Sequence, residues 1–247
     1  RLRDLMRPHA SPQALSHELS AISNELSQPY RKKRKVYTNL LKKALLGLRR
    51  LEVDHLLLTG DLAHCGMSAE FLEMKAILSI TGWWGPRRLT VIPGNHDVYT
   101  EDAAQSRAFE RHFAEYVAAP GDDAARDTLR ARGRAAYPVR RVIDGRVAVY
   151  ILCSALPTVA LTAWGRVGRA QRDRLRALRR TEPAGVESRL LLVHHNLHTR
   201  GARKDATSGL RDRLAVSRVA DQIGADAILH GHDHHPYAGH VDRNNRR

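Results

Sequence analysis

Four apolar segments of strand length end in polar side chains that can bind metal ions or transfer protons. Each cluster alone has an ordinary explanation, such as a tight turn or a buried pair of histidines. Four at equivalent positions are seldom a coincidence, because the carboxyl ends of strands in open α/β sheets meet at one edge of the fold. The segments read HLLLTGD (55–61), LTVIPGNHD (89–97), LLLVHH (190–195) and AILHGHDHH (227–235). Their polar residues include Asp61, Asn95, His96, Asp97, His194, His195, His232 and His234.

This mixture of oxygen and imidazole groups suits a borderline divalent cation such as Mn, Fe, Co or Zn. An all-oxygen set would favour Mg or Ca, and a thiolate set would favour structural zinc. The two cysteines, Cys65 and Cys153, form no C-x-x-C pair. A carboxylate can bridge two cations, so we expect a two-metal site, with ions about 3.5–4 Å apart that activate one water and hold a phosphoryl group.

The segments between the clusters have helical spacing. Near-continuous apolar runs predict strands that are buried on both faces, and their alternation with helices predicts an α/β fold. Asp144-Gly145, between YPVRRVI and RVAVYILCSA, predicts a hairpin and therefore a mixed sheet. Residues 100–136 predict a helical insertion that either shapes a substrate pocket or only connects two elements. The other helices are expected within 36–51, 68–80 (capped by Ser68), 167–180 and 211–224.

Length and composition indicate one domain over residues 1–247. There is no apolar stretch of the roughly 18 residues that a membrane helix needs, so no membrane association is expected. The start, RLRDLMRPH, lacks the apolar core of a signal peptide, and two cysteines fit a reducing compartment. We therefore expect a cytoplasmic location.

The net charge of +15 could serve binding to a phosphate-rich partner such as nucleic acid. However, the arginines are scattered through nearly every predicted helix, and RKKRK at 31–35 is the one compact basic run. Such runs are most often solvated surface. Nucleic acid is therefore a possible partner but not the favoured one, and the oligomeric state is open.

The order GD, GNHD, HH and GHDH over residues 60–234 resembles the calcineurin-like metallophosphoesterase superfamily. GNHDVY and HGHDHH most resemble its bacterial phosphodiesterase-like members. The resemblance implies a sandwich of two mixed β-sheets flanked by helices. It also implies hydrolysis of a small phosphoester, most readily a phosphodiester, by a metal-activated water at a dinuclear centre.

The resemblance assigns metal ligands residue by residue. Asp61 would bridge both cations, and Asn95 would bind the second cation through its amide oxygen. His194 and His232 would complete this second site, while His234 would bind the first cation. His194 is preferred to its neighbour because the family's ligand is the first residue of the pair.

Other residues would act on the substrate. His96 would contact the phosphate and protonate the leaving oxygen, with Asp97 orienting its ring. His195, His198 and Arg200 are weaker candidates for substrate binding. An ordinary position on the solvent-exposed surface explains His198 and Arg200 almost as well.

One family motif is missing. The family opens with a strand that ends in D-x-H, and the nearest match is Asp4-Leu5-Met6, whose thioether is a poor ligand for these cations. Either the chain has been trimmed after this motif, which we favour, or the first metal site has degenerated. We therefore expect the N-terminal strand to be absent.

Two other functions compete with phosphodiester hydrolysis. A DNA repair-type nuclease would suit the positive charge, and an inactive interaction module would suit the missing motif. Protein dephosphorylation is disfavoured, because the phosphoprotein phosphatases carry GDxxDRG where this chain has GDLAHCG.

Overall fold

The computed structural model describes residues 38–159, 162–235 and 237–239. The chain divides into two compact units, residues 1–52 and 53–247. In the first unit the described part is a helix over residues 38–50, where helical spacing predicted one. Asp4, Met6 and the basic run at 31–35 lie outside the described residues, so the predictions made for them stay predictions.

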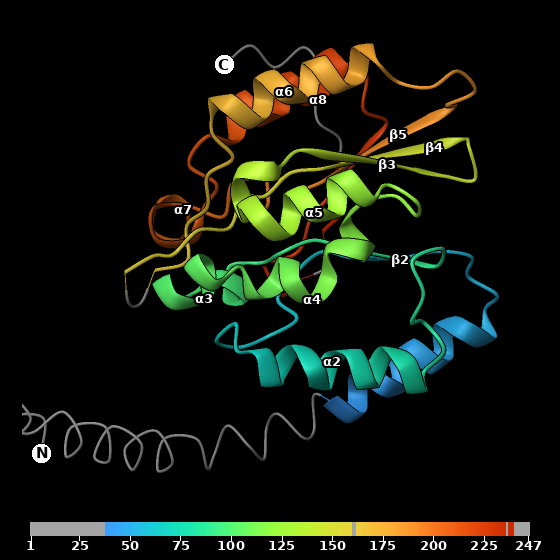
Figure 1. Ribbon diagram of the computed structural model, residues 1–247. Helices are drawn as coiled ribbons and strands as arrows, with labels where there is room; N and C mark the ends of the chain where they lie inside the picture. The colour runs from blue at the N-terminus through green and yellow to red at the C-terminus, as the bar shows by residue number, and fades with distance from the viewer. Residues whose placement is uncertain (1–37, 160–161, 236, 240–247) are drawn as a thin grey trace, which may run out of the picture. The chain divides into compact units, whose positions relative to one another are not determined.

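The described residues of the second unit form two β-sheets (Figure 1). In the smaller sheet, β1 (Leu56–Leu58) pairs in parallel with β2 (Leu89–Val91). The larger sheet has the order β3-β4-β5-β6 and is mixed, because only the β3–β4 pair is antiparallel. Its strands are β3 (Val139–Ile143), β4 (Val147–Ile151), β5 (Ser188–Leu192) and β6 (Ala227–Leu229). Two sheets with flanking helices confirm the predicted α/β fold, although the smaller sheet is parallel in the described residues.

The predicted hairpin joins β3 and β4. Asp144 and Gly145 both have positive φ, at 49° and 71°, and Arg146 N donates to the carbonyl of Ile143 at 3.0 Å. Positive φ at both central residues is what tight hairpin turns of this kind require. The Asp-Gly pair therefore sets the register in which Ile143 faces Val147.

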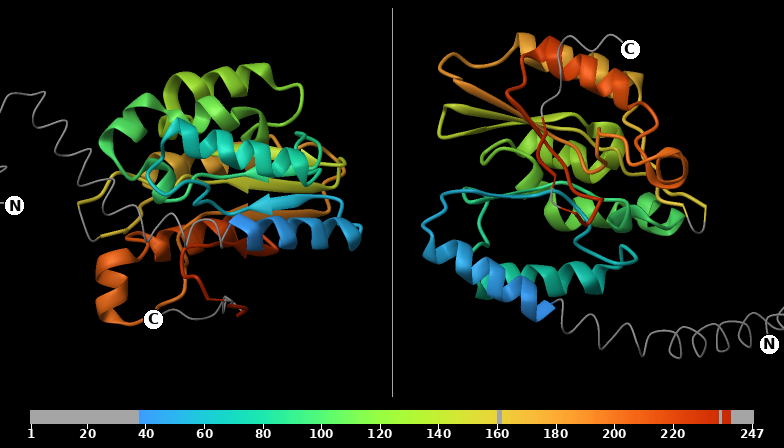
Figure 2. Two further views of the ribbon diagram at one scale, coloured as in Figure 1. Left: turned by 90° about the horizontal axis from the view of Figure 1, so that it is seen from below. Right: turned by 180° about the vertical axis from the view of Figure 1, so that it is seen from behind.

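Helices connect and cover the strands. Helix α2 follows β1, and α6 and α8 precede β5 and β6. Helices α5 (Asp123–Arg132) and α8 (Arg213–Ile223) lie on opposite sides of the larger sheet, as Figure 1 and the left view of Figure 2 show. The bounds are α2 (Ser68–Ile80), α6 (Arg169–Arg180), α7 (Ala202–Ser208) and α8 (Arg213–Ile223).

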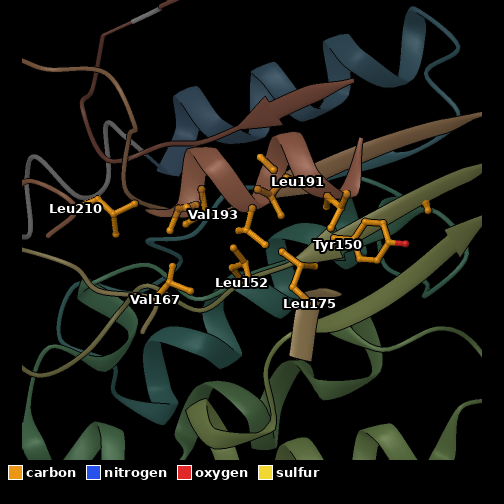
Figure 3. Close-up of a cluster of buried hydrophobic side chains, with 12 residues drawn as sticks. Tyr150, Leu152, Val167, Leu175, Leu191, Val193 and Leu210 are labelled. Atoms are coloured by element: carbon orange, nitrogen blue, oxygen red, sulfur yellow. The ribbon is translucent and has the colours of Figure 1, made fainter. Parts of the chain in front are cut away.

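A hydrophobic core lies between the larger sheet and helices α6 and α8 (Figure 3). Tyr150 and Leu191 from the sheet meet Leu175 of α6 and Val216 of α8, and all four are fully buried. Burial of a side chain of this size stabilises a fold by about 1.5–3 kcal/mol. This packing holds the ends of β5 and β6 in place, which matters because the polar clusters begin there.

Residues 101–136 are mostly helical. Phe71 of α2 meets Phe113 of α4 edge to face, with ring centroids 5.7 Å apart, and Asp122 caps α5 by accepting from Ala125 N at 3.0 Å. Whether this segment is an insertion relative to the family stays a prediction. Its elements are α3 (Glu101–Ser106), α4 (Ala108–Val117), α5 (Asp123–Arg132) and η2 (Gly133–Ala136).

Among the residues that the structure describes, no helix combines the length and the apolar character needed to cross a membrane.

Candidate metal centre

Parallel pairing of β1 with β2 brings Asp61 close to Asn95. Leu58 faces Val91, and Ile92 N continues the ladder by donating to the carbonyl of Leu58 at 3.1 Å. Just beyond the strands, His96 N donates to Asp61 Oδ1 at 3.0 Å. The two loops after β1 and β2 are therefore tied together at the carboxylate.

Parallel pairing of β5 with β6 does the same for His194 and His232. Val193 N donates to the carbonyl of Leu229 at 3.1 Å, and Gly231 N donates to the carbonyl of His194 at 3.0 Å. Both histidines thus lie just beyond the carboxyl end of the larger sheet. They face the loops that follow β1 and β2 of the smaller sheet.

The side chains of all four strand ends converge. Asp61, His194 and His232 each offer one ligand atom, and these atoms lie within 4.8 Å of one another. Asn95 Oδ1 lies 3.0 Å from His194 Nε2 and 2.9 Å from His232 Nδ1. Asp61 Oδ2 lies 3.3 Å from the same His194 nitrogen. The sequence predicted these four residues to meet, and the structure brings them together.

Main-chain carbonyls fix which nitrogen of each imidazole faces the centre. His194 Nδ1 donates to the carbonyl of Thr59 at 2.7 Å, and His232 Nε2 donates to the carbonyl of Ser208 at 2.7 Å. In the neutral rings, lone pairs then remain on His194 Nε2 and His232 Nδ1, which point at the oxygens of Asn95 and Asp61. Such an inward-facing set of acceptors is what a divalent cation stabilises, so these residues fit a metal ion.

The charges of the site are strongly coupled. Burial opposes ionisation of Asp61, but the His194 ring and the His96 amide hold the pKa of its carboxyl below the ordinary range. Burial opposes protonation of His194 as well, yet the Asp61 carboxylate raises the His194 pKa. Burial and the neighbouring His194 lower the pKa of His232 to about 4. Protons and cations therefore compete for the same atoms.

Three predicted ligands have a left-handed backbone. The φ angles are 58° at Asp61, 70° at His232 and 54° at His234. This conformation costs a residue other than glycine about 1–2 kcal/mol. Strained backbone of this kind tends to gather at functional sites, and residue-type patterns did not reveal it.

His96 and Asp97 lie beside the centre, on η1 (His96–Val98). His96 Nδ1 lies 2.9 Å from the carbonyl of His64, and its ring stacks with those of His64 and Tyr99. Asp97 is completely buried and accepts from Ala63 N and Gly94 N, both at 2.8 Å. These contacts differ from the predicted one: the His64 carbonyl orients the His96 ring, while Asp97 ties the two loops together. Burial raises the pKa of Asp97 to about 7.

The predicted substrate-binding residues have partners inside the protein. His195 is completely buried, with Nδ1 2.8 Å from Ser154 Oγ and Nε2 2.9 Å from the carbonyl of Ala163. His198 and Arg200 both contact Asp233, which the sequence reasoning left without a role. Asp233 lies between the two histidines of the GHDH motif, and this position in the sequence could have indicated a role for it at the site.

His234 is exposed and shares a pocket of about 670 Å³ with the converging side chains. The pocket is lined by residues that include Thr59, Asp61, His194, His232 and Tyr237. His234 therefore opens onto the same space as Asp61, His194 and His232.

The fold and the site define an α/β protein with a metal-binding centre at the carboxyl ends of its strands. The family model for calcineurin-like phosphoesterases matches residues 30–236, and the chain belongs to this family. No curated protein matches the chain significantly. Family membership implies metal-dependent hydrolysis of a phosphoester, and Asp61, His194 and His232 form a cluster that can hold a metal.

Proposed function

We propose that this protein hydrolyses a small phosphodiester with the help of two divalent cations, drawn from Mn, Fe, Co and Zn. The observation that carries the proposal is the convergence of acceptor atoms from Asp61, Asn95, His194 and His232 beside His96. The bound cations would lower the pKa of a water molecule and neutralise charge on the phosphoryl group.

The ligands divide between the two cations as the family resemblance implies. Asp61 would contact both cations, and His234 would contact the first. Asn95, His194 and His232 would hold the second cation, which fits their contacts through the single oxygen Asn95 Oδ1.

His96 would supply the proton to the leaving oxygen. Its Nδ1 donates to the carbonyl of His64, so Nε2 is the nitrogen left for the substrate. The rings of His64 and Tyr99 lie 5.3 and 5.6 Å from that of His96 and restrict its rotation. A positioned general acid contributes about 10²–10⁴-fold in rate.

A small substrate has more support than nucleic acid. Helix α6 is rich in arginine, but Arg172, Arg176 and Arg179 form ion pairs with carboxylates of the same protein. These pairs reduce the positive charge that the helix offers to a polyanion. A cytoplasmic location, based on the low cysteine count, is also part of this proposal.

The test compares hydrolysis of bis(p-nitrophenyl) phosphate and p-nitrophenyl phosphate in Mn²⁺ by the wild type and by Asp61→Asn. Asparagine keeps the shape and tolerates positive φ, so a loss reports on the missing charge. We expect diester turnover to fall at least about 100-fold. Asp127→Asn, an exposed carboxylate on α5, is the control and should keep wild-type turnover.

Two outcomes would contradict the proposal. Wild-type turnover no higher than that of Asp61→Asn would rule out hydrolysis at this centre. Faster cleavage of the monoester than of the diester would retain a phosphoesterase and exclude the phosphodiester preference.

A further inference from the structure

The guanidinium of Arg200 is enclosed by protein. Only 9% of its side chain is exposed, and Nε is buried without a hydrogen-bond partner among the described residues. A substrate phosphate can bind only to side-chain atoms that are accessible to solvent, and the guanidinium of Arg200 is largely inaccessible. The contacts of this arginine therefore have to be explained within the fold.

Arg200 connects two segments that meet at His232. Its Nη1 donates to Asp233 Oδ1 at 2.8 Å, and Asp233 is the next residue after His232. Its Nη2 donates to both the carbonyl and the hydroxyl of Ser208, at 2.8 and 2.7 Å. One planar group thus joins the loop after β6 to the end of α7.

The carbonyl of Ser208 is also the acceptor for His232. His232 Nε2 donates to it at 2.7 Å, which leaves Nδ1 facing Asn95 Oδ1 at 2.9 Å. His232 has a φ of 70°, so its backbone does not hold this orientation without support. The neighbouring Asp233 is held at both oxygens, since Arg200 binds Oδ1 and His198 Nε2 contacts Oδ2 at 3.2 Å.

We infer that Arg200 is a positioning residue for His232. It fixes Asp233 and Ser208 together, and they hold the backbone and the ring of His232 so that Nδ1 points into the metal centre. The inference rests on the proposed metal site. It differs from the sequence-based expectation that Arg200 binds the substrate phosphate.

The test uses Arg200→Lys and Arg200→Gln, since lysine keeps the charge but not the planar fork that reaches two partners. Mn²⁺ binding is measured by calorimetry in phosphate-free buffer. Loss of a group that orients a metal ligand typically weakens affinity by about 10–100-fold. We expect a loss in this range, with the KM for bis(p-nitrophenyl) phosphate within about twofold of wild type at saturating Mn²⁺.

The matched control is Arg172→Lys. Arg172 forms a comparably enclosed ion pair with Asp212, with 17% and 14% of the two side chains exposed, but it lies on α6 and binds Asp212 rather than a neighbour of a predicted ligand. We expect it to lower the unfolding midpoint and to leave Mn²⁺ affinity unchanged. If Arg200→Gln fails to fold, Asp233→Asn removes the charge at the other end of the same contact while keeping an acceptor oxygen.

A second experiment measures the position of the proton on the His232 ring and requires neither bound metal nor catalytic activity. Long-range ¹H–¹⁵N correlations of the His232 ring in the metal-free protein at pH 8 report which nitrogen carries the proton. The wild type should show a proton on Nε2, and Arg200→Gln should show a mixture of both neutral forms.

The outcomes separate the two ideas. Unchanged Mn²⁺ affinity with a tenfold rise in KM would show that Arg200 binds substrate and would overturn the inference. Unchanged affinity, KM and ring signal would overturn it as well. A wild type that binds Mn²⁺ but does not hydrolyse the diester would contradict the proposed function alone, and the Arg200 comparison of affinity and ring signal would still decide the inference.

Discussion

At the scale of single residues, the candidate metal centre combines converging metal-ligating side chains with a left-handed backbone at three of the predicted ligands. Carboxylate, amide and imidazole groups at four strand ends indicated a metal centre, and the structure brings Asp61, Asn95, His194 and His232 together. The positive φ at Asp61, His232 and His234 could not be predicted, because residue type only weakly constrains φ outside glycine.

The strain at His234 can be separated from its side chain. We expect His234→Gly to unfold with a free energy about 1 kcal/mol higher than that of His234→Ala, because glycine adopts a φ of 54° without steric cost. Both variants lack the imidazole and should lose Mn²⁺ affinity equally. Urea unfolding of the metal-free proteins and calorimetric titration provide the two measurements. Equal stability of the two variants would show that the backbone there is not strained.

At the scale of elements, the centre depends on two loops that approach very closely. A Cβ added to Gly60 would lie 2.6 Å from Gly94 N and 2.7 Å from His194 Nδ1, and a Cβ on Gly94 would overlap Asp61 Oδ1. Glycine at both positions lets the loops after β1 and β2 pack against each other. The close approach, more than flexibility, explains why these motifs contain glycine.

Gly60→Ala tests this approach. We expect the positive φ of 102° to cost about 1 kcal/mol and the overpacking to cost about 1–3 kcal/mol more. Gly145→Ala is the control, because Gly145 also has positive φ but its added Cβ would meet nothing within 4 Å. Only Gly60→Ala should also weaken Mn²⁺ binding. Equal losses of unfolding free energy in the two variants would mean that the loops separate at little cost.

Elements were predictable where a local pattern decides them. Apolar runs predicted β1, β2, β5 and β6, and helical spacing predicted α2, α6 and α8, with Gly224 ending α8 in a left-handed cap. The predicted Ser68 cap was wrong: Met67 is the cap residue, and Glu70 accepts from Met67 N at 3.1 Å and Cys65 N at 2.9 Å. A buried carboxylate can replace the capping side chain, and local sequence does not show that burial.

The contacts that Asp233 makes with distant residues were not predictable. Arg200 and His198 lie more than thirty residues before Asp233 in the sequence, and no periodic pattern connects them. Both were therefore assigned to substrate, the usual interpretation of cationic residues near a metal site. The contact with Asp233 depends on how α7 packs beside the loop after β6, which only the folded structure reveals.

At the scale of the whole molecule, the excess of arginine serves partly to connect elements. Arg141 is almost completely buried and donates to the carbonyl of Tyr116 at 2.9 Å, joining β3 to α4, and burial lowers its pKa to about 10. Arg174 of α6 donates to the carbonyl of Tyr137 at 3.1 Å. A net charge of +15 therefore does not by itself indicate a surface for nucleic acid.

One buried carboxyl is expected to make the stability of the molecule depend on pH. Glu110 on α4 is 3% exposed, and burial raises its pKa to about 7, although its own amide, Tyr137 and Arg107 oppose the shift. Because the folded-state pKa exceeds the ordinary value of 4.5, the folded protein binds this proton more tightly than the unfolded chain. The contribution of Glu110 to the free energy of unfolding is fully present below about pH 4.5, and it is lost as the pH rises through 7.

Glu110→Gln should remove this dependence, because the amide stays neutral at every pH. The loss in the wild type corresponds to about 3 kcal/mol, so the unfolding free energy of the variant relative to wild type should rise by about that amount between pH 5 and pH 8. Urea unfolding at four pH values in this range measures the difference.

Glu182→Gln is the control. Burial opposes the charge of Glu182, but Arg189 and the Tyr150 hydroxyl outweigh burial and hold the pKa of Glu182 below its ordinary value, so Glu182 stays charged in the folded and the unfolded protein. Its substitution should lower stability equally across the range, and the same flat difference for Glu110→Gln would show that Glu110 is ionised in the folded protein throughout.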